Sequence, residues 1–277
     1  MTFPRARVLA MGLRTLLGAA PQGFFIPYRY AASVRPDGYP ALAPIFVAAE
    51  PSMRDTMAAI GRCAGVWGGF GGPAPAPRFE QDWFPRLDGA AAYALVRTRK
   101  PRRIVEIGSG HSTRFMARAV ADEGHACEIL CIDPAPRAML AGLPVVHRAA
   151  VLADAGREAV ADLGAGDVLF IDSSHIAMPG SDVDRLFGDV LPGLAAGVLL
   201  HVHDIFLPDP YPGDWVWRGY NEQLAVACLL QGGGYAILHA SHWVATRRRE
   251  WLAEVGLDRL PLLPGARESS LWLVKKG

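Results

Sequence analysis

The chain has 277 residues, of which 51% are hydrophobic, enough for one large core with a small accessory region. Its 28 basic and 27 acidic residues give a formal net charge of +1, so it lacks the basic excess that is usual in nucleic-acid-binding proteins. The four cysteines do not have the spacing of a metal site and are typical of reduced thiols, so we expect a cytoplasmic protein.

The N-terminal part, residues 1–84, lacks the alternation of strands and helices that marks a sheet domain. Residues 8–17 predict an amphipathic helix, which Arg14 makes too polar to span a bilayer or to serve as a signal peptide. A second helix is predicted over residues 51–62, with a proline in its first turn. We expect an accessory or cap region that covers a pocket or mediates a homodimer, with peripheral membrane contact as an alternative.

From residue 85 to residue 277, predicted helices alternate with predicted strands. The strands cover residues 104–107, 128–133, 145–149, 167–172, 198–205, 235–239 and 270–274. The helices cover residues 87–98, 112–123, 136–141, 154–163, 181–191, 218–230 and 247–255. This alternation predicts an α/β fold with a doubly wound parallel sheet.

A glycine-rich turn joins the first of these strands to its helix. The strand carries an acid, Glu106, near its end, and Gly108 and Gly110 follow it. Glycine permits positive φ and a close approach of a ligand, and the helix N-terminus presents unpaired N–H groups. We expect Ser112 or Thr113 to be the N-cap of the helix. The residues expected beside the ligand are Glu106, Gly108, Ser109, Gly110 and Ser112.

A second acid, Asp133, ends the next predicted strand, 25 residues after Gly108. In nucleotide-binding βαβ units an acid at about this offset binds the ribose. The strand, the glycine loop, the helix, the second strand and its terminal acid together predict a nucleotide site. The dinucleotide fingerprint would place a third glycine where this chain has Thr113, which argues against NAD(P).

In these motifs the chain resembles the class I S-adenosylmethionine-dependent methyltransferases, over roughly residues 85–277. The acid and Gly-x-Gly of their first motif match Glu106 and residues 108–110, and their ribose-binding acid matches Asp133. The resemblance implies that the glycine loop lies along the methionine part of the cofactor. It also implies a Rossmann-like, mostly parallel seven-stranded sheet with an antiparallel last strand.

Polar residues follow the fourth and fifth predicted strands, and we expect them at the same sheet edge as the glycine loop. They are Asp172, His175, His203 and Asp204, and Asp172 is also expected beside the cofactor. The pattern resembles the methyltransferase branch of the catechol O-methyltransferase-like and cephalosporin-hydroxylase-like enzymes, which hold a divalent metal at these positions. The resemblance implies Asp172, His203 and Asp204 as metal ligands. The His203 nitrogen favours manganese, iron or zinc over magnesium.

A metal-free site is an open alternative, in which His203 or His175 is the general base. The expected function is methyl transfer from S-adenosylmethionine to an oxygen, less often a nitrogen, of a small molecule. Other possibilities are cyclisation with the same cofactor, a nicotinamide oxidoreductase and a non-catalytic cofactor-binding protein. We expect the N-terminal region and the proline- and tryptophan-rich loop of residues 208–217 to form the acceptor pocket, with Asn221 and Glu222 within reach.

Overall fold

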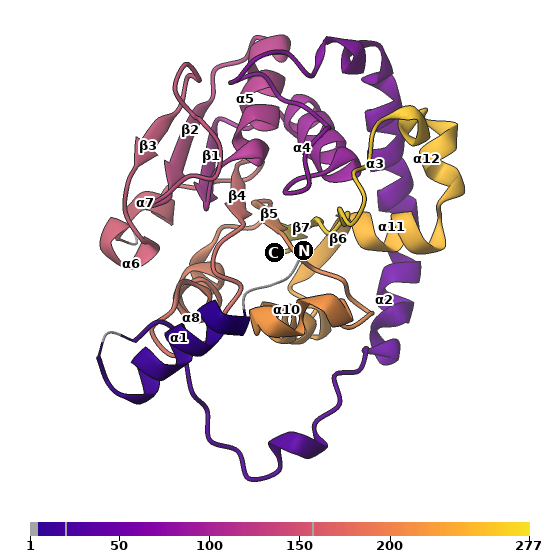
Figure 1. Ribbon diagram of the computed structural model, residues 1–277. Coiled ribbons are helices and arrows are strands. Elements are labelled where there is room, and N and C mark those ends of the chain that lie inside the picture. Colours follow the sequence, from indigo (N-terminus) through magenta and orange to yellow (C-terminus); the bar gives the residue numbers. More distant parts are fainter. Residues whose placement is uncertain (1–4, 20, 157) are drawn as a thin grey trace. The chain divides into compact units, whose positions relative to one another are not determined.

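A computed structural model of the protein describes residues 5–19, 21–156 and 158–277 (Figure 1). The chain divides into two compact units, Met1–Asp37 and Gly38–Gly277. The first unit contains helix α1 (Arg5–Leu16), which includes most of the helix expected over residues 8–17. Within the described ranges, no helix has the length and apolar character needed to cross a membrane.

The second unit is built on a seven-stranded sheet with the order β3-β2-β1-β4-β5-β7-β6. Strands β1 to β5 run parallel, and β7 is antiparallel to both of its neighbours, β5 and β6. The strands are β1 (Arg103–Ile107), β2 (Glu128–Ile132), β3 (Val146–Arg148), β4 (Val168–Ile171), β5 (Leu199–Val202), β6 (Tyr235–Ala240) and β7 (Leu271–Lys275). Strands β4 and β5 are buried throughout, as expected for central strands covered on both faces. The predicted sheet, including its antiparallel last strand, is confirmed.

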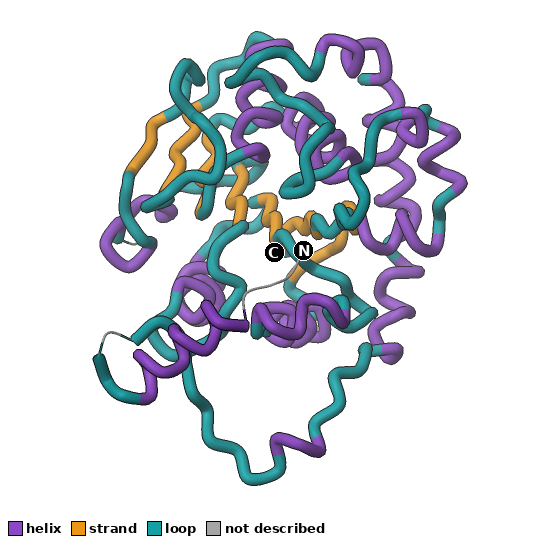
Figure 2. Tube along the Cα trace, viewed as in Figure 1, coloured by secondary structure: helices purple, strands orange, loops and turns teal. Residues whose placement is uncertain are grey.

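Helices cover both faces of this sheet, with α4 and α5 on one side and α8 and α10 on the other (Figure 1). Figure 2 shows the same layers as a row of strands between helices. The helices of the second unit are α2 (Ala43–Ala48), α3 (Glu50–Arg62), α4 (Arg86–Arg99), α5 (His111–Glu123), α6 (Leu152–Ala155), α7 (Glu158–Ala161), α8 (Asp182–Arg185), α9 (Leu191–Gly193), α10 (Glu222–Gln231), α11 (Ser241–Arg247) and α12 (Glu250–Glu254).

The compact sheet unit begins at Gly38, whereas the sequence placed the domain boundary between residues 84 and 85. Helix α3 packs against α4 and β6, and buries its apolar face there. Phe46 of α2 stacks on Trp243 with ring centroids 5.4 Å apart, and the Trp243 indole N–H donates to Glu50 at 3.0 Å. Residues 38–84 therefore belong to the sheet unit, because the apolar side chains of α2 and α3 are buried against it.

Several predicted helices differ from the observed ones for local backbone reasons. Residues 136–141 form a loop with bends and not a helix. The helix expected over residues 154–163 is divided into α6 and α7, and Gly156 adopts φ 80° between them. The helix expected from residue 218 begins only at Glu222, because a 3₁₀ turn (Gly213–Arg218) ends at Gly219 with φ 66°. The helix expected over residues 247–255 is the end of α11 followed by α12.

Gly108 occupies the tightest position in the turn after β1. It has φ 81°, and a Cβ atom there would lie 1.8 Å from the Asp172 carbonyl oxygen. We expect Gly108→Ala to lower the free energy of unfolding by about 4 kcal/mol, since backbone strain and a clash with the main chain act together. Gly124→Ala is the matched control, with φ 67° and open space around its Cβ, and should cost about 1 kcal/mol. Urea denaturation measures both, and equal losses would contradict the prediction.

Candidate active site

The loop between β1 and α5 is held by backbone hydrogen bonds. The Gly108 N–H donates to the Ile132 carbonyl of β2 at 3.0 Å. Helix α5 begins at His111 with Gly110 as its N-cap, and the Gly110 N–H donates to Thr113 Oγ1 at 3.0 Å. The expected N-cap at Ser112 or Thr113 is therefore wrong, because both residues lie inside the first turn of the helix.

Glu106 lies behind this loop and is completely buried. Its carboxylate accepts hydrogen bonds from the Ser112 hydroxyl, from Thr113 Oγ1 at 2.5 Å and from the Cys131 thiol at 3.4 Å. Burial outweighs these hydrogen bonds and raises the pKa of Glu106 to about 7. The side chain thus ties β1 to the first turn of α5 and is not part of the pocket lining.

Asp133 fixes the conformation of the same loop from β2. Its Oδ2 accepts from the Ser109 N–H at 2.7 Å and from the Ser109 hydroxyl at 3.3 Å, and its Oδ1 accepts from the Ala135 N–H at 2.7 Å. Asp133 is only partly buried and is not one of the pocket-lining residues. Its contact with a ribose stays a prediction.

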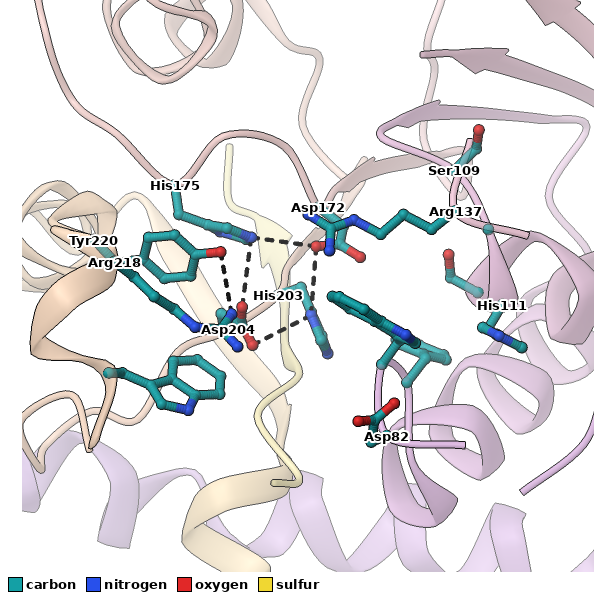
Figure 3. Close-up of a pocket in the computed structure, with 15 residues that line it drawn as sticks. Asp82, Ser109, His111, Arg137, Asp172, His175, His203, Asp204, Arg218 and Tyr220 are labelled. Carbon is teal, nitrogen blue, oxygen red and sulfur yellow. Dashed lines mark hydrogen bonds and ion pairs between the residues drawn. The ribbon is translucent and has the colours of Figure 1, made fainter. Parts of the chain in front are cut away.

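A pocket opens beside the glycine loop and reaches the ends of β4 and β5 (Figure 3). It brings together residues that the sequence predicted from separate motifs, namely Ser109, Gly110, Ser112, Asp172, His175, His203 and Asp204. The other lining residues are Asp82, Trp83, Phe84, His111, Arg137, Trp215, Arg218 and Tyr220. Trp215 comes from the loop in which a substrate-facing wall was expected.

His175 is held between carboxylates on both sides of its ring. Its Nδ1 lies 2.9 Å from Glu222 Oε2, and its Nε2 lies 3.3 Å from Asp172 Oδ1 and 3.5 Å from Asp204 Oδ2. Glu222 is fully buried at the start of α10. It therefore orients the imidazole from behind, and Nε2 faces the two aspartates of the pocket (Figure 3).

His203, the residue that follows β5, makes a similar arrangement. Its Nε2 lies 3.4 Å from Asp88 Oδ2, and its Nδ1 lies 3.5 Å from Asp172 Oδ1 and from Asp204 Oδ1. Asp88 is fully buried in α4 and accepts the backbone N–H groups of Ser269 and Ser270, each at 3.0 Å. Two histidine–carboxylate pairs thus converge on Asp172 and Asp204.

The charges of this cluster stabilise one another. Burial alone would lower the pKa of both histidines. Hydrogen bonds to Asp172 and Glu222 outweigh burial for His175, and the charges of Asp172 and Asp204 do so for His203, so both pKa values are well above 6.5. Burial would raise the pKa of Asp172, but the charge of His203 holds it well below its ordinary value. Burial raises the pKa of Glu222.

The backbone is strained at two residues of the cluster. His175 has φ 60° and Asp204 has φ 55°, in the left-handed region that costs a residue other than glycine about 1–2 kcal/mol. The His175 carbonyl accepts the N–H groups of Asn221 and Glu222, and Asp204 Oδ1 accepts the Ser269 hydroxyl at 3.1 Å. Strain of this kind persists where surrounding contacts impose it, and it gathers at functional sites.

Sequence reasoning did not identify Asp88 or Arg218. Asp88 lies in an apolar helix that precedes the glycine loop, and its one sequence signal is a carboxylate among small apolar residues. Arg218 ends a tryptophan-rich turn and resembles a surface cation in the sequence. Both reach the site through tertiary packing.

The expected metal site does not fit the arrangement of its donors. Among the residues that the structure describes, no group of three or more His, Cys, Asp or Glu side chains could hold a metal ion. Asp172, His203 and Asp204 lie as imidazole–carboxylate pairs.

The buried Glu106 gives a pH-dependent prediction for stability. A folded-state pKa raised from 4.5 to about 7 stabilises the protein below pH 4.5, and this contribution is lost as the pH rises through 7. As the pH rises from 4.5 to 7, the free energy of unfolding of the wild type should fall by about 3 kcal/mol relative to that of Glu106→Gln, which has no carboxyl group to ionise at this position. Denaturant titrations across this range measure it, with the exposed Glu128→Gln as control. Parallel pH profiles for Glu106→Gln and the wild type would refute it.

Comparisons with known proteins support a methyltransferase. Residues 105–205 match a protein-family model described as a methyltransferase domain. The matched segment begins in β1 and includes the glycine loop, Asp133, Asp172, His175, His203 and Asp204. A search of curated proteins found no match.

Three solved structures are distantly similar to this chain. The SAH-bound methyltransferase PaMTH1 of Podospora anserina is 17% identical with a TM-score of 0.45, covering 92% of this chain and 100% of that chain. The branched-chain polyamine synthase of Thermus thermophilus is 15% identical with a TM-score of 0.42, covering 78% and 64%. The plantazolicin methyltransferase BamL, in complex with SAH, is 10% identical with a TM-score of 0.38, covering 83% and 100%. At such TM-scores none of these likenesses bears on substrate or mechanism.

The family match and the observed sheet agree with each other. The matched residues supply strands β1 to β5 and the loops at their carboxyl ends, and the chain continues into the antiparallel β7. Residues 105–205 therefore match a methyltransferase domain, and the sheet to which they contribute has the strand order given above.

Proposed function

We propose that this protein transfers a methyl group from S-adenosylmethionine to a hydroxyl oxygen of a small molecule. The observation that carries the proposal is the His175–Glu222 pair, whose imidazole faces Asp172 and Asp204 in the pocket that begins at the glycine loop. A buried imidazole with a carboxylate behind it is suited to accept a proton from a hydroxyl group.

The cofactor would lie along residues 108–110, with its ribose toward Asp133. When bound, it supplies an electrophilic methyl group on a sulfonium whose departure leaves a neutral thioether. Asp172 and Asp204 form ion pairs with the two histidines, and their negative charges would also stabilise the positive charge of the sulfonium. The Gly108 turn brings the loop against the Asp172 backbone, so the methyl donor and the carboxylates share one pocket.

His175 is the general base of the proposed reaction, and it acts in the neutral form that it adopts above its raised pKa. Its Nε2 takes the proton of the acceptor hydroxyl as the oxygen forms its bond to the methyl carbon. Glu222 holds the Nδ1–H and stabilises the imidazolium that forms. His203, fixed by Asp88, orients Asp172 and Asp204 from the opposite side. We propose a small molecule as the acceptor because side chains of the glycine loop and of the segments that follow β4 and β5 line one shared pocket.

Calorimetric titration tests the cofactor assignment. We expect S-adenosylmethionine and S-adenosylhomocysteine to bind at one saturable site and NADH not to bind, because Thr113 stands where a dinucleotide loop has its third glycine. The titration is repeated after treatment with a chelator, and the affinities should not change. Binding of NADH without binding of S-adenosylmethionine would replace this proposal with an oxidoreductase.

The role of Glu222 is tested through the pKa of His175 in the complex with S-adenosylhomocysteine. Glu222 raises this pKa, so Glu222→Gln should lower it relative to the wild type, as measured by NMR titration of the imidazole. The rising limb of the pH–rate profile should shift to lower pH by the same amount, because the base acts in its neutral form.

Activity measurements complete this test. His175→Ala should lower kcat about 10²- to 10⁴-fold with S-adenosylhomocysteine affinity unchanged. His125→Ala, which follows the far end of α5, is the matched control and should leave kcat unchanged. Full activity of His175→Ala on any accepted substrate would show that another group is the base.

A further inference from the structure

Arg218 offers the pocket a cation that no carboxylate of the described chain neutralises. We infer that the methyl acceptor carries an anionic group, a carboxylate or a phosphate, and that Arg218 binds it. The identification of the bound molecule as the methyl acceptor rests on the proposed function. The anion site itself is inferred from the geometry of Arg218 alone.

Aromatic rings and one hydroxyl hold the Arg218 side chain in place. Its guanidinium lies 4.0 Å from the ring centroid of Trp215, 5.3 Å from that of Tyr220 and 5.4 Å from that of Trp217. Its Nη1 donates to the Tyr220 hydroxyl at 3.2 Å. Stacked arginines lose little further freedom on binding a planar or tetrahedral anion, so the site is organised in advance.

The acidic residues near Arg218 already have other partners. Asp214 pairs with Arg267 at 2.8 Å, and Asp209 pairs with Arg247 and with His242. Glu222 is bonded to His175. Across the part of the chain that the structure describes, no carboxylate lies within ion-pair distance of Arg218.

One donor of Arg218 also lacks an acceptor. Its Nε is buried and makes no hydrogen bond within the described residues. A buried N–H of a charged group without an acceptor is costly, and an anion is the partner that satisfies it best.

The position of Arg218 assigns it to the acceptor and not to the cofactor. Tyr220, which receives its hydrogen bond, packs on the ring of His175 with centroids 4.5 Å apart. The glycine loop has an arginine of its own, Arg137, whose backbone N–H donates to the Ser109 carbonyl and whose guanidinium stacks on Trp83. An anion on Arg218 therefore lies on the side of the general base, and the reacting hydroxyl is close to the anionic group in the same molecule.

Small probes test the anion site without knowledge of the acceptor. The protein is saturated with S-adenosylhomocysteine and titrated at constant ionic strength with inorganic phosphate, with benzoate and with benzamide as the uncharged match of benzoate. Tryptophan fluorescence reports binding, because Trp215 and Trp217 flank the site. We expect at least one anion to bind saturably and benzamide not to bind, and the stronger anion identifies the acceptor group as phosphate or carboxylate.

Variants assign the binding to the side chain. Arg218→Gln should lower the affinity for the anion at least tenfold and leave the affinity for S-adenosylhomocysteine unchanged. The anion affinity of Arg218→Lys should lie between those of Arg218→Gln and the wild type. Arg259→Gln, an exposed arginine of the same unit, is the matched control and should bind the anion as the wild type does.

Three results would overturn the inference: neither anion binds, benzamide binds as well as benzoate, or Arg218→Gln keeps the wild-type anion affinity. Failure of the proposed function gives a different result. In that case S-adenosylhomocysteine does not bind, while the anion titration of the free protein still depends on Arg218.

Discussion

The close approach of the β1–α5 turn to the end of β4 is the contact on which the site depends. At Gly108 no side chain would fit, because the Asp172 carbonyl occupies the place of a Cβ atom, and the Asp172 N–H donates to the Ile107 carbonyl at 2.9 Å. This contact places the proposed cofactor loop and the carboxylate of Asp172 in one pocket. Glu106 and Asp133 support it by binding the hydroxyl and N–H groups of the same turn.

The histidine–carboxylate cluster depends on mutual neutralisation of its charges. Asp88 and Glu222 are fully buried and would be strongly destabilising without partners. Backbone N–H groups and His203 stabilise Asp88, and His175 stabilises Glu222. Because each imidazole bridges a buried acid and the pocket aspartates, a proton gained or lost at His175 changes the electrostatics of the whole cluster. The folding of this site and its proposed acid–base chemistry therefore use the same ion pairs.

The sequence predicted those parts of the structure that local patterns specify. The apolar strands, the glycine turn and the polar residues that follow β4 and β5 are each visible over about ten residues, and the parallel sheet brings them to one edge. Asp88 and Arg218 act through packing between distant segments, which no local pattern records. The start of the compact sheet unit at residue 38 was not predicted for the same reason. The sequence of α3 indicates an amphipathic helix but does not indicate that its apolar face packs against α4 and β6.

Two arginine–aromatic stacks mark opposite ends of the pocket. Arg137 on Trp83 lies with the glycine loop, and Arg218 on Trp215 and Tyr220 lies with His175. In-line transfer needs donor sulfur, methyl carbon and acceptor oxygen in one row, and an enzyme gains most by fixing both ends of that row. In the proposed reaction the glycine loop fixes the donor end. Arg218, held by aromatic rings beside the proposed base His175, would fix the other end, so recognition of the acceptor and activation of its hydroxyl would fall to neighbouring side chains.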